Sequence, residues 1–353
     1  MVNTGEAVAA GHGPAVTGSD PHRHLTTLEG WRDFIHAAPA PPALLPGGKY
    51  AALDEDARRA YDDERLDYHT RLGVVATSTL RKVVTTGRRL TLLNRHAISA
   101  RQGLILSGPA GTGKTTAIAQ FGKTHEAIDR DRHPGLDRIP VIYATVPPAA
   151  TPRMLAMEFA RFLGLPVLPR ANMTDIIEAV CGVAVDMRVS AVLVDEIHNM
   201  QLATRSGAEV SDTLKYFSER LPATFVYAGI DLEHQGLFTG IRGRQIAGRF
   251  TLIPAVAFPL AGEWQSVILT LEDALRLHQH QPGTLASLDK YLHQRTGGMI
   301  GSLSHLIRGA AIEAILTGTE RITRKQLETL DIDHAAQQSS APGPAARHRA
   351  SAL

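Results

Sequence analysis

Short apolar runs alternate with longer amphipathic stretches through the middle of the 353-residue chain. Five runs have the length and composition of buried strands: 103–107, 140–146, 191–197, 224–230 and 250–258. Stretches with helical periodicity lie between them, at 152–162, 172–187 and 208–220. This alternation predicts an α/β fold, a three-layer αβα arrangement around a five-stranded parallel sheet. Pro254 in the fifth run indicates an edge strand, because proline cannot donate to a neighbouring strand.

The two ends of the chain follow a different pattern. After Pro259 the periodicity is helical only, with helices predicted at 262–280, 285–295 and 300–316 and from Thr323. Before the first strand, charged helices are predicted at 53–72 and 77–97, and a short one near Trp31. The predicted organisation is a flexible tail at 1–50, an N-terminal helical region at 51–100, an α/β core at 101–261, a helical subdomain at 262–334 and a disordered tail at 335–353.

A phosphate-binding loop follows the first strand. Its residues are Gly108, Pro109, Ala110, Gly111, Thr112, Gly113, Lys114 and Thr115, and Thr116 continues into a helix. The glycines let successive backbone N–H groups point at a phosphate, and the helix N-terminus adds its partial positive charge. Lys114 is predicted to neutralise the β- and γ-phosphates of ATP, while the Thr115 hydroxyl is a Mg²⁺ ligand.

The third strand ends in Asp195 and Glu196. At the end of a buried strand, the Asp195 carboxylate can help Thr115 hold Mg²⁺, and Glu196 can polarise a water for attack on the γ-phosphate. The next polar residue, His198, either orients Glu196, reports the γ-phosphate to DNA-facing loops, or is an ordinary polar side chain at a strand end. Together the two motifs predict ATP binding and hydrolysis.

Composition limits the cellular setting. A single cysteine, Cys181, excludes an intramolecular disulfide and fits a cytoplasmic protein, and no apolar run is long enough to span a membrane. The net charge of +2 does not by itself mark a nucleic-acid binder. The helix at 77–97 nevertheless carries Arg81, Lys82, Arg88, Arg89 and Arg95, which either meet phosphates or form a solvated face.

These motifs over residues 100–334 resemble an AAA+ ATPase, whose C-terminal helices form a lid over the nucleotide. Five segments resemble more narrowly the TniB family of transposition ATPases: Asp195–Asn199, Pro147–Pro148, Arg244–Phe250, Thr296–Leu303 and Arg65–His69. TniB proteins are related to the TnsC, IstB and phage Mu B regulators. The resemblance implies a homo-oligomer, a ring or a helical filament, that assembles on double-stranded target DNA and recruits a DDE transposase.

The resemblance also implies an arginine that reaches the γ-phosphate of the neighbouring subunit. Arg249 fits that position best, with Arg242 and Arg244 as competitors. Two positions depart from the AAA+ pattern. After the fourth strand, only Asp231 or Tyr227 is available as the polar sensor, and the lid has glycines where many relatives have an arginine, with Arg308 as the nearest substitute. Slow, regulatory hydrolysis is therefore expected.

The sequence thus predicts an ATP-dependent, DNA-binding regulator of transposition. Two other functions stay open: a nucleotide-gated signalling or scaffold ATPase without a DNA role, and an ATPase that resembles a helicase loader. The loops at 200–210 and 233–248 are expected at a DNA-facing or inter-subunit surface.

Overall fold

A five-stranded parallel sheet forms the centre of the computed structural model, which describes residues 23–38, 40–71, 73–166, 170–200, 205–233 and 248–332 (side chains of the fifth range from 211). The strands are β1 (Gly103–Ser107), β2 (Val141–Thr145), β3 (Ala191–Asp195), β4 (Thr224–Gly229) and β5 (Phe250–Pro254). Their order is β2-β3-β4-β1-β5. The predicted fold class is confirmed, and β5 is an edge strand as its proline indicated.

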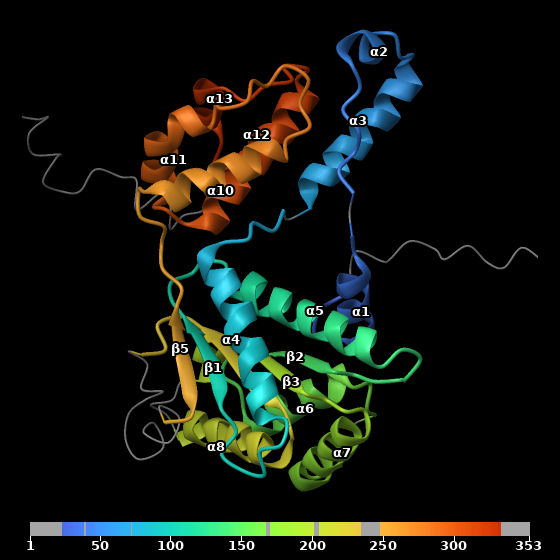
Figure 1. The fold of residues 1–353 in the computed structure, drawn as a ribbon, viewed down its shortest axis with the longest axis vertical. Helices are drawn as coiled ribbons and strands as arrows, with labels where there is room; N and C mark the ends of the chain where they lie inside the picture. The colour runs from blue at the N-terminus through green and yellow to red at the C-terminus, as the bar shows by residue number, and fades with distance from the viewer. Residues whose placement is uncertain are drawn as a thin grey trace, which may run out of the picture.

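Helices cover both faces of the sheet (Figure 1). On one face lie α4 (Ser78–Asn94) and α5 (Lys114–Arg132), and on the other α6 (Pro152–Phe162), α7 (Met173–Asp186) and α8 (Arg205–Arg220). The first four residues of β3, from Ala191 to Val194, are fully buried, which explains why this strand is a continuous apolar run. Because all strands are parallel, the loops that follow β1, β3 and β4 meet at one edge.

The helical segment after β5 forms a second hydrophobic cluster, called the lid below, around the fully buried Trp264. Its elements are α10 (Gly262–Asp273), the 3-10 turn η2 (Ala286–Leu288), α11 (Asp289–Thr296), α12 (Ile300–Leu316) and α13 (Arg324–Thr329). The helix predicted at 262–280 is shorter than expected. The Glu272 carboxylate, near the end of α10, accepts a hydrogen bond from the Leu285 N–H and contacts His280, so it organises a loop where the helix was predicted to continue.

The N-terminal segment contacts both hydrophobic clusters. Helix α1 (Leu28–His36) packs on the core, and its Trp31 is fully buried against α5. After α2 (Gly47–Ala51), helix α3 (Glu55–Thr70) packs against α12 of the lid, and the chain then returns to the core through α4 (Figure 1). The short helix expected near Trp31 corresponds to α1, which the buried tryptophan fixes on the core, and α2 follows it. The domain boundaries stay predictions.

No helix in the described segments combines the length and the apolar character needed to cross a membrane.

Candidate nucleotide-binding site

The loop from Gly108 to Thr115 leaves the carboxyl end of β1 and enters α5 directly. Gly111 and Gly113 adopt φ values of 77° and 82°, in the left-handed region that favours glycine. Gly113 immediately precedes the first turn of α5, a 19-residue helix. The N-terminus of that helix therefore lies at the centre of the loop. The exposed Ala110 stands at the tip, and the Thr112 hydroxyl donates to the Pro109 carbonyl. The loop is therefore a concave backbone cradle with a helix N-terminus beneath it.

Lys114 lies within this cradle. Its Nζ donates to the carbonyls of Gly108 at 2.9 Å and Pro109 at 2.7 Å. Burial lowers the pKa of the Lys114 ammonium, and the nearby carboxylates of Glu196, Asp195 and Asp231 oppose that effect. The ammonium is thus held between the loop and an acidic group of side chains.

Asp195 is the meeting point of three polar groups. Its Oδ2 accepts hydrogen bonds from Thr115 Oγ1 at 2.7 Å and from Tyr143 Oη at 3.0 Å. Its Oδ1 accepts from the backbone N–H of Glu196 at 2.8 Å. The Asp195 residue is 2% exposed, so its carboxylate is fixed in orientation. A hydroxyl and a carboxylate in contact beside a phosphate cradle fit Mg²⁺, which takes one or two protein oxygens and completes its shell with phosphates and water.

Glu196 has a different environment from Asp195. Its backbone has φ of 55°, which turns the side chain out of the strand line, and the side chain is 41% exposed. His198 Nε2 lies 3.2 Å from Glu196 Oε2, while its Nδ1 accepts from the Ile230 N–H at 3.4 Å. This arrangement places the ring proton on Nε2, facing the carboxylate. His198 therefore connects Glu196 to the end of β4, a position from which it can orient the Glu196 carboxylate.

The lid contacts the phosphate-binding loop through its backbone. The Gly301 N–H, in the first turn of α12, donates to the Gly111 carbonyl at 2.9 Å. A Cβ at position 301 would lie 3.1 Å from that oxygen, so only glycine allows this approach without a shift. Between loop, lid and the chain leading into α4 lies a cavity of about 120 Å³, and a second of about 670 Å³ borders Thr115 and Thr116. Gly301 is thus a contact between the lid and the loop.

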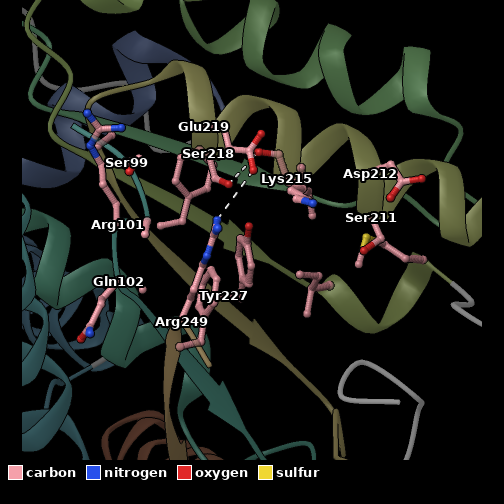
Figure 2. Close-up of a pocket in the computed structure, with 18 of the residues that line it drawn as sticks. Ser99, Arg101, Gln102, Ser211, Asp212, Lys215, Ser218, Glu219, Tyr227 and Arg249 are labelled. Atoms are coloured by element: carbon pink, nitrogen blue, oxygen red, sulfur yellow. Dashed lines mark hydrogen bonds and ion pairs between the residues drawn. The ribbon is translucent and has the colours of Figure 1, made fainter. Parts of the chain in front are cut away.

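Arg249 lies away from this cluster. It precedes β5, and its carbonyl accepts from the Gly103 N–H, so it stands at the amino edge of the sheet whereas the loop leaves the carboxyl edge. Figure 2 shows its side chain pointing toward Glu219 of α8, with Nη1 3.7 Å from Glu219 Oε1, across a cavity of about 290 Å³. The side chain is 38% exposed. Its competitors Arg242 and Arg244 lie outside the described residues.

The candidate sensor residues separate clearly. Tyr227 is buried and stacks on Phe250 at a centroid distance of 4.8 Å, so it is a core residue. Asp231 has φ of 45°, and it is one of the carboxylates that oppose the lowering of the Lys114 pKa by burial. Arg308 donates to the carbonyls of His69 and Thr70 at the end of α3, beside the larger cavity. Asp231 is therefore the polar residue after β4 that reaches the site, and Arg308 holds α3 on the lid.

Sequence reasoning missed Tyr143 and Trp31. The sequence pattern indicates only that Tyr143 is one apolar position of a strand. Its hydroxyl nevertheless donates to Asp195, and burial raises the pKa of that hydroxyl. Trp31 stacks on the Tyr143 ring at 5.8 Å with an interplanar angle of 14°, and its Nε1 donates to Glu126 Oε2 at 2.6 Å. A tyrosine in an otherwise aliphatic strand was the available signal for Tyr143. No feature of the neighbouring sequence indicated that Trp31 supports the site.

The sheet order, the loop and the Asp-Glu strand end together define a P-loop ATPase of the AAA+ fold. Solved structures share this fold. The Aeropyrum pernix ORC2 protein (ADPNP-ADP complexes) has a TM-score of 0.59 at 19% identity, over 81% of this chain and 74% of that one. The Aeropyrum pernix ORC1 protein in complex with DNA has 0.58 at 17%, over 78% and 69%, and Cdc6p from Pyrobaculum aerophilum has 0.52 at 13%, over 74% and 68%.

The family is more specific than the fold. The family model described as bacterial TniB protein matches residues 76–258, slightly more than half of the chain. The chain therefore belongs to the TniB family of AAA+ ATPases. Among curated proteins, no sequence matches it.

Proposed function

We propose that this TniB-family protein binds ATP with Mg²⁺ at the phosphate-binding loop, hydrolyses it slowly, and uses the nucleotide state to control its assembly on double-stranded target DNA, where it recruits a DDE transposase. The observation that carries the proposal is the separation of the site into two parts. Lys114, Thr115, Asp195 and Glu196 gather at one edge of the sheet, and Arg249 lies at the other.

The residues at the carboxyl edge of the sheet have separate roles in binding and hydrolysing ATP. The N–H groups of the loop, from Gly108 through Thr116, cradle the phosphates, and Lys114 exchanges its two carbonyl partners for phosphate oxygens. The Thr115 hydroxyl and Asp195 are the protein ligands for Mg²⁺, which supplies charge neutralisation at the phosphates. Glu196 is exposed enough to receive a water, and His198 orients its carboxylate.

Arg249 completes the site of a neighbouring subunit. Within its own chain it is placed at the opposite edge from Lys114, and its single close acidic partner among the described residues, Glu219, holds it at 3.7 Å. A half-exposed guanidinium with a weak partner is free to bind a developing phosphate charge across a subunit contact. ATP binding and oligomerisation are then coupled, because each site contains residues from two chains.

A mixing experiment tests the division of the site. Glu196→Gln and Arg249→Ala are each expected to lose most ATPase activity, for different reasons. In a mixture, an intact Glu196 from one variant meets an intact Arg249 from the other, and about one quarter of the wild-type activity is expected from random pairing at equal amounts of the two chains. Lys114→Ala, which cannot bind nucleotide, is the control that restores nothing when added to Glu196→Gln. Activity no higher than the sum of the separate variants would place Arg249 outside the neighbour's site.

Assembly and partner are tested separately. Sedimentation with a non-hydrolysable ATP analogue, with and without duplex DNA, is expected to show large assemblies only when both are present. Pull-down of the transposase from the same element should then depend on the analogue. A monomer that binds ATP and ignores DNA at low salt would contradict the transposition role and favour the signalling ATPase. Capture of a replicative helicase instead of a transposase would favour the helicase-loader function.

A further inference from the structure

The outer face of α4 carries a concentrated positive charge that the nucleotide site does not use. Its exposed cations are Arg81, Lys82, Arg88, Arg89 and Arg95. The helix contains no acidic residue, and within the described segments none of these five side chains forms an ion pair. The whole chain has a net charge of only +2, so this local concentration of positive charge does not follow from the overall composition.

The cations stand in two rows. Arg81, Arg88 and Arg95 follow one another at intervals of seven residues, and Lys82 and Arg89 do the same beside them. In an α-helix seven residues advance the chain about 10.5 Å and return to nearly the same side. Exposed Thr85 and Leu92 lie between the rows. Helix α4 runs along one side of the core, from the end near the lid to the opposite edge of the sheet (Figure 1), and the two rows follow its axis.

The orientation of α4 is fixed by its other face. Val83 and Leu90 are buried in the core, and Gly87 lies against the Phe121 ring of α5. At its end, Asn94 Nδ2 donates to Thr224 Oγ1 at 2.8 Å. The basic strip cannot turn away from solvent, and it is presented by a rigid helix.

Helix α3 provides the contrast of an ordinary solvated face. Two exposed arginines of α3 and its C-terminal end pair with acids one turn away, Arg59 with Glu55 at 3.2 Å and Arg71 with Asp67 at 2.6 Å, while Arg58 donates to the Ala51 carbonyl. Such pairs lower the self-repulsion of a charged surface. On α4 the repulsion is left uncompensated, which is typical of a surface that meets an external polyanion.

We infer that the outer face of α4 binds the phosphate backbone of duplex DNA, without sequence readout. This deepens the proposed function, on which it rests, by assigning a surface for the DNA. Arginine and lysine in rows suit phosphates, and a gain in affinity follows from counterion release. An anionic membrane is a poorer match, because a surface-bound helix must bury a continuous apolar face in lipid, and the apolar face of α4 is already committed to the core.

Charge-removing variants test the assignment. The double variant Arg88→Gln/Arg89→Gln is expected to bind a 60-base-pair duplex about 10- to 100-fold more weakly at 0.1 M salt, and to lower the slope of log affinity against log salt by about 1.8. Arg59→Gln/Arg324→Gln is the matched control. It removes the same charge from side chains that are 66% and 63% exposed and that each pair with an acid, and it is expected to bind like the wild type.

Two readouts separate this inference from the proposed function. If the wild type binds DNA and the α4 variant keeps its affinity and salt slope, the surface assignment is wrong while the function stands. If the wild type binds no DNA at low salt, both fail. Binding of the ATP analogue in the absence of DNA should be unchanged in the α4 variant, and a loss of nucleotide affinity there would make α4 a support of the nucleotide site instead. Loss of binding to phosphatidylserine vesicles with intact DNA binding would also overturn the inference.

Discussion

The core and the lid each contain one fully buried tryptophan, but the two tryptophans come from different parts of the chain. Trp264 comes from the lid's own first helix and donates through Nε1 to the Asp289 carbonyl at 3.0 Å. Trp31 comes from a segment that precedes the core by about 70 residues, and it inserts between α5 and the ring of Tyr143. The lid is therefore self-contained at its centre, whereas the core takes in a side chain from the N-terminal region, which stacks on the tyrosine that bonds Asp195.

The N-terminal region binds the two bodies with different chemistry. Helix α1 is held on the core by aromatic packing, and α3 is held on the lid by an ion pair. Arg65 is fully buried, with both its terminal nitrogens 2.7 Å from the Glu320 carboxylate. The difference predicts that α1 acts on metal binding through Tyr143 and Asp195, and that α3 acts on the position of the lid. The following predictions run from the largest effect to the smallest.

Trp31→Ala is expected to have the largest effect. Removing a fully buried indole costs about 3–5 kcal/mol of unfolding free energy through the lost burial and the cavity left behind. Chemical denaturation followed by circular dichroism measures it. Trp264→Ala is the matched control and should destabilise the lid by a similar amount. Only Trp31→Ala is expected to raise the Mg²⁺ concentration needed for tight ATP binding. An equal Mg²⁺ shift in both variants would remove the distinction between core and lid.

Arg65→Met should loosen α3 from the lid. The variant leaves the Glu320 carboxylate, in a residue 3% exposed, without its charge partner, which costs about 3–5 kcal/mol locally. Hydrogen exchange of α3 and α12 amides reports the opening, while amides of β3 should keep their protection. Adding Glu320→Gln removes the uncompensated charge and is expected to recover most of the protection. No recovery in the double variant would mean that packing of the arginine stem, and not charge pairing, holds α3.

Acid is expected to weaken the same contact. Burial lowers the pKa of His69 to about 4, with Arg276 and Arg65 adding to the effect. The ring is neutral in the folded protein and its Nε2 accepts from the Arg276 N–H at 3.2 Å. The unfolded chain takes up a proton below its ordinary pKa of about 6.5, so stability is complete above pH 7 and falls as the pH drops from 6.5 toward 4. At pH 5 the loss from this residue is about 2 kcal/mol.

His69→Gln tests this contribution, because glutamine does not titrate. The variant should lose about 2 kcal/mol less than the wild type between pH 7 and pH 5. His125 in the core also has a pKa lowered to about 4 by burial, so its contribution remains in both proteins and gives the background slope. Identical pH profiles would show that the pKa of His69 is not lowered in the folded protein.

Tyr143→Phe should have the smallest effect. It removes one of the two side-chain hydrogen bonds to Asp195 Oδ2 and keeps the stacking on Trp31. About 1 kcal/mol of lost orientation corresponds to about a fivefold higher Mg²⁺ requirement for ATP binding. A fluorescent ATP analogue titrated with and without Mg²⁺ measures this, and binding without the metal should be unchanged. Tyr216→Phe on α8 is the control. A weaker affinity in the absence of Mg²⁺ would show that the tyrosine supports the loop itself.

The motifs of the site could be predicted from the sequence because their geometry depends only on neighbouring residues. The loop from Gly108 to Thr115 needs only a strand before it and a helix after it, and Asp195 needs only to end an apolar strand. The same holds for most strands and helices, whose periodicity reports which side is buried. The absence of a sensor arginine among the lid glycines stays a prediction, and the structure adds a contact between Gly301 and Gly111 that the sequence did not indicate. A contact across a cleft leaves no trace in the segment that contains the glycine.

The sequence by itself therefore determined the class of fold and the alternation that builds the sheet, and it located the loop and the strand end for which phosphate and metal binding are proposed. The tertiary structure alone decided that Trp31 supports Tyr143, that Tyr143 holds Asp195, that Arg65 reaches Glu320 across 255 positions, and that Arg249 stands on the edge opposite the loop. The physical reason is the range of the interactions. Backbone conformation and helix or strand periodicity depend on a few neighbouring residues, whereas a side-chain partner distant in sequence is chosen by how the packed elements fit together.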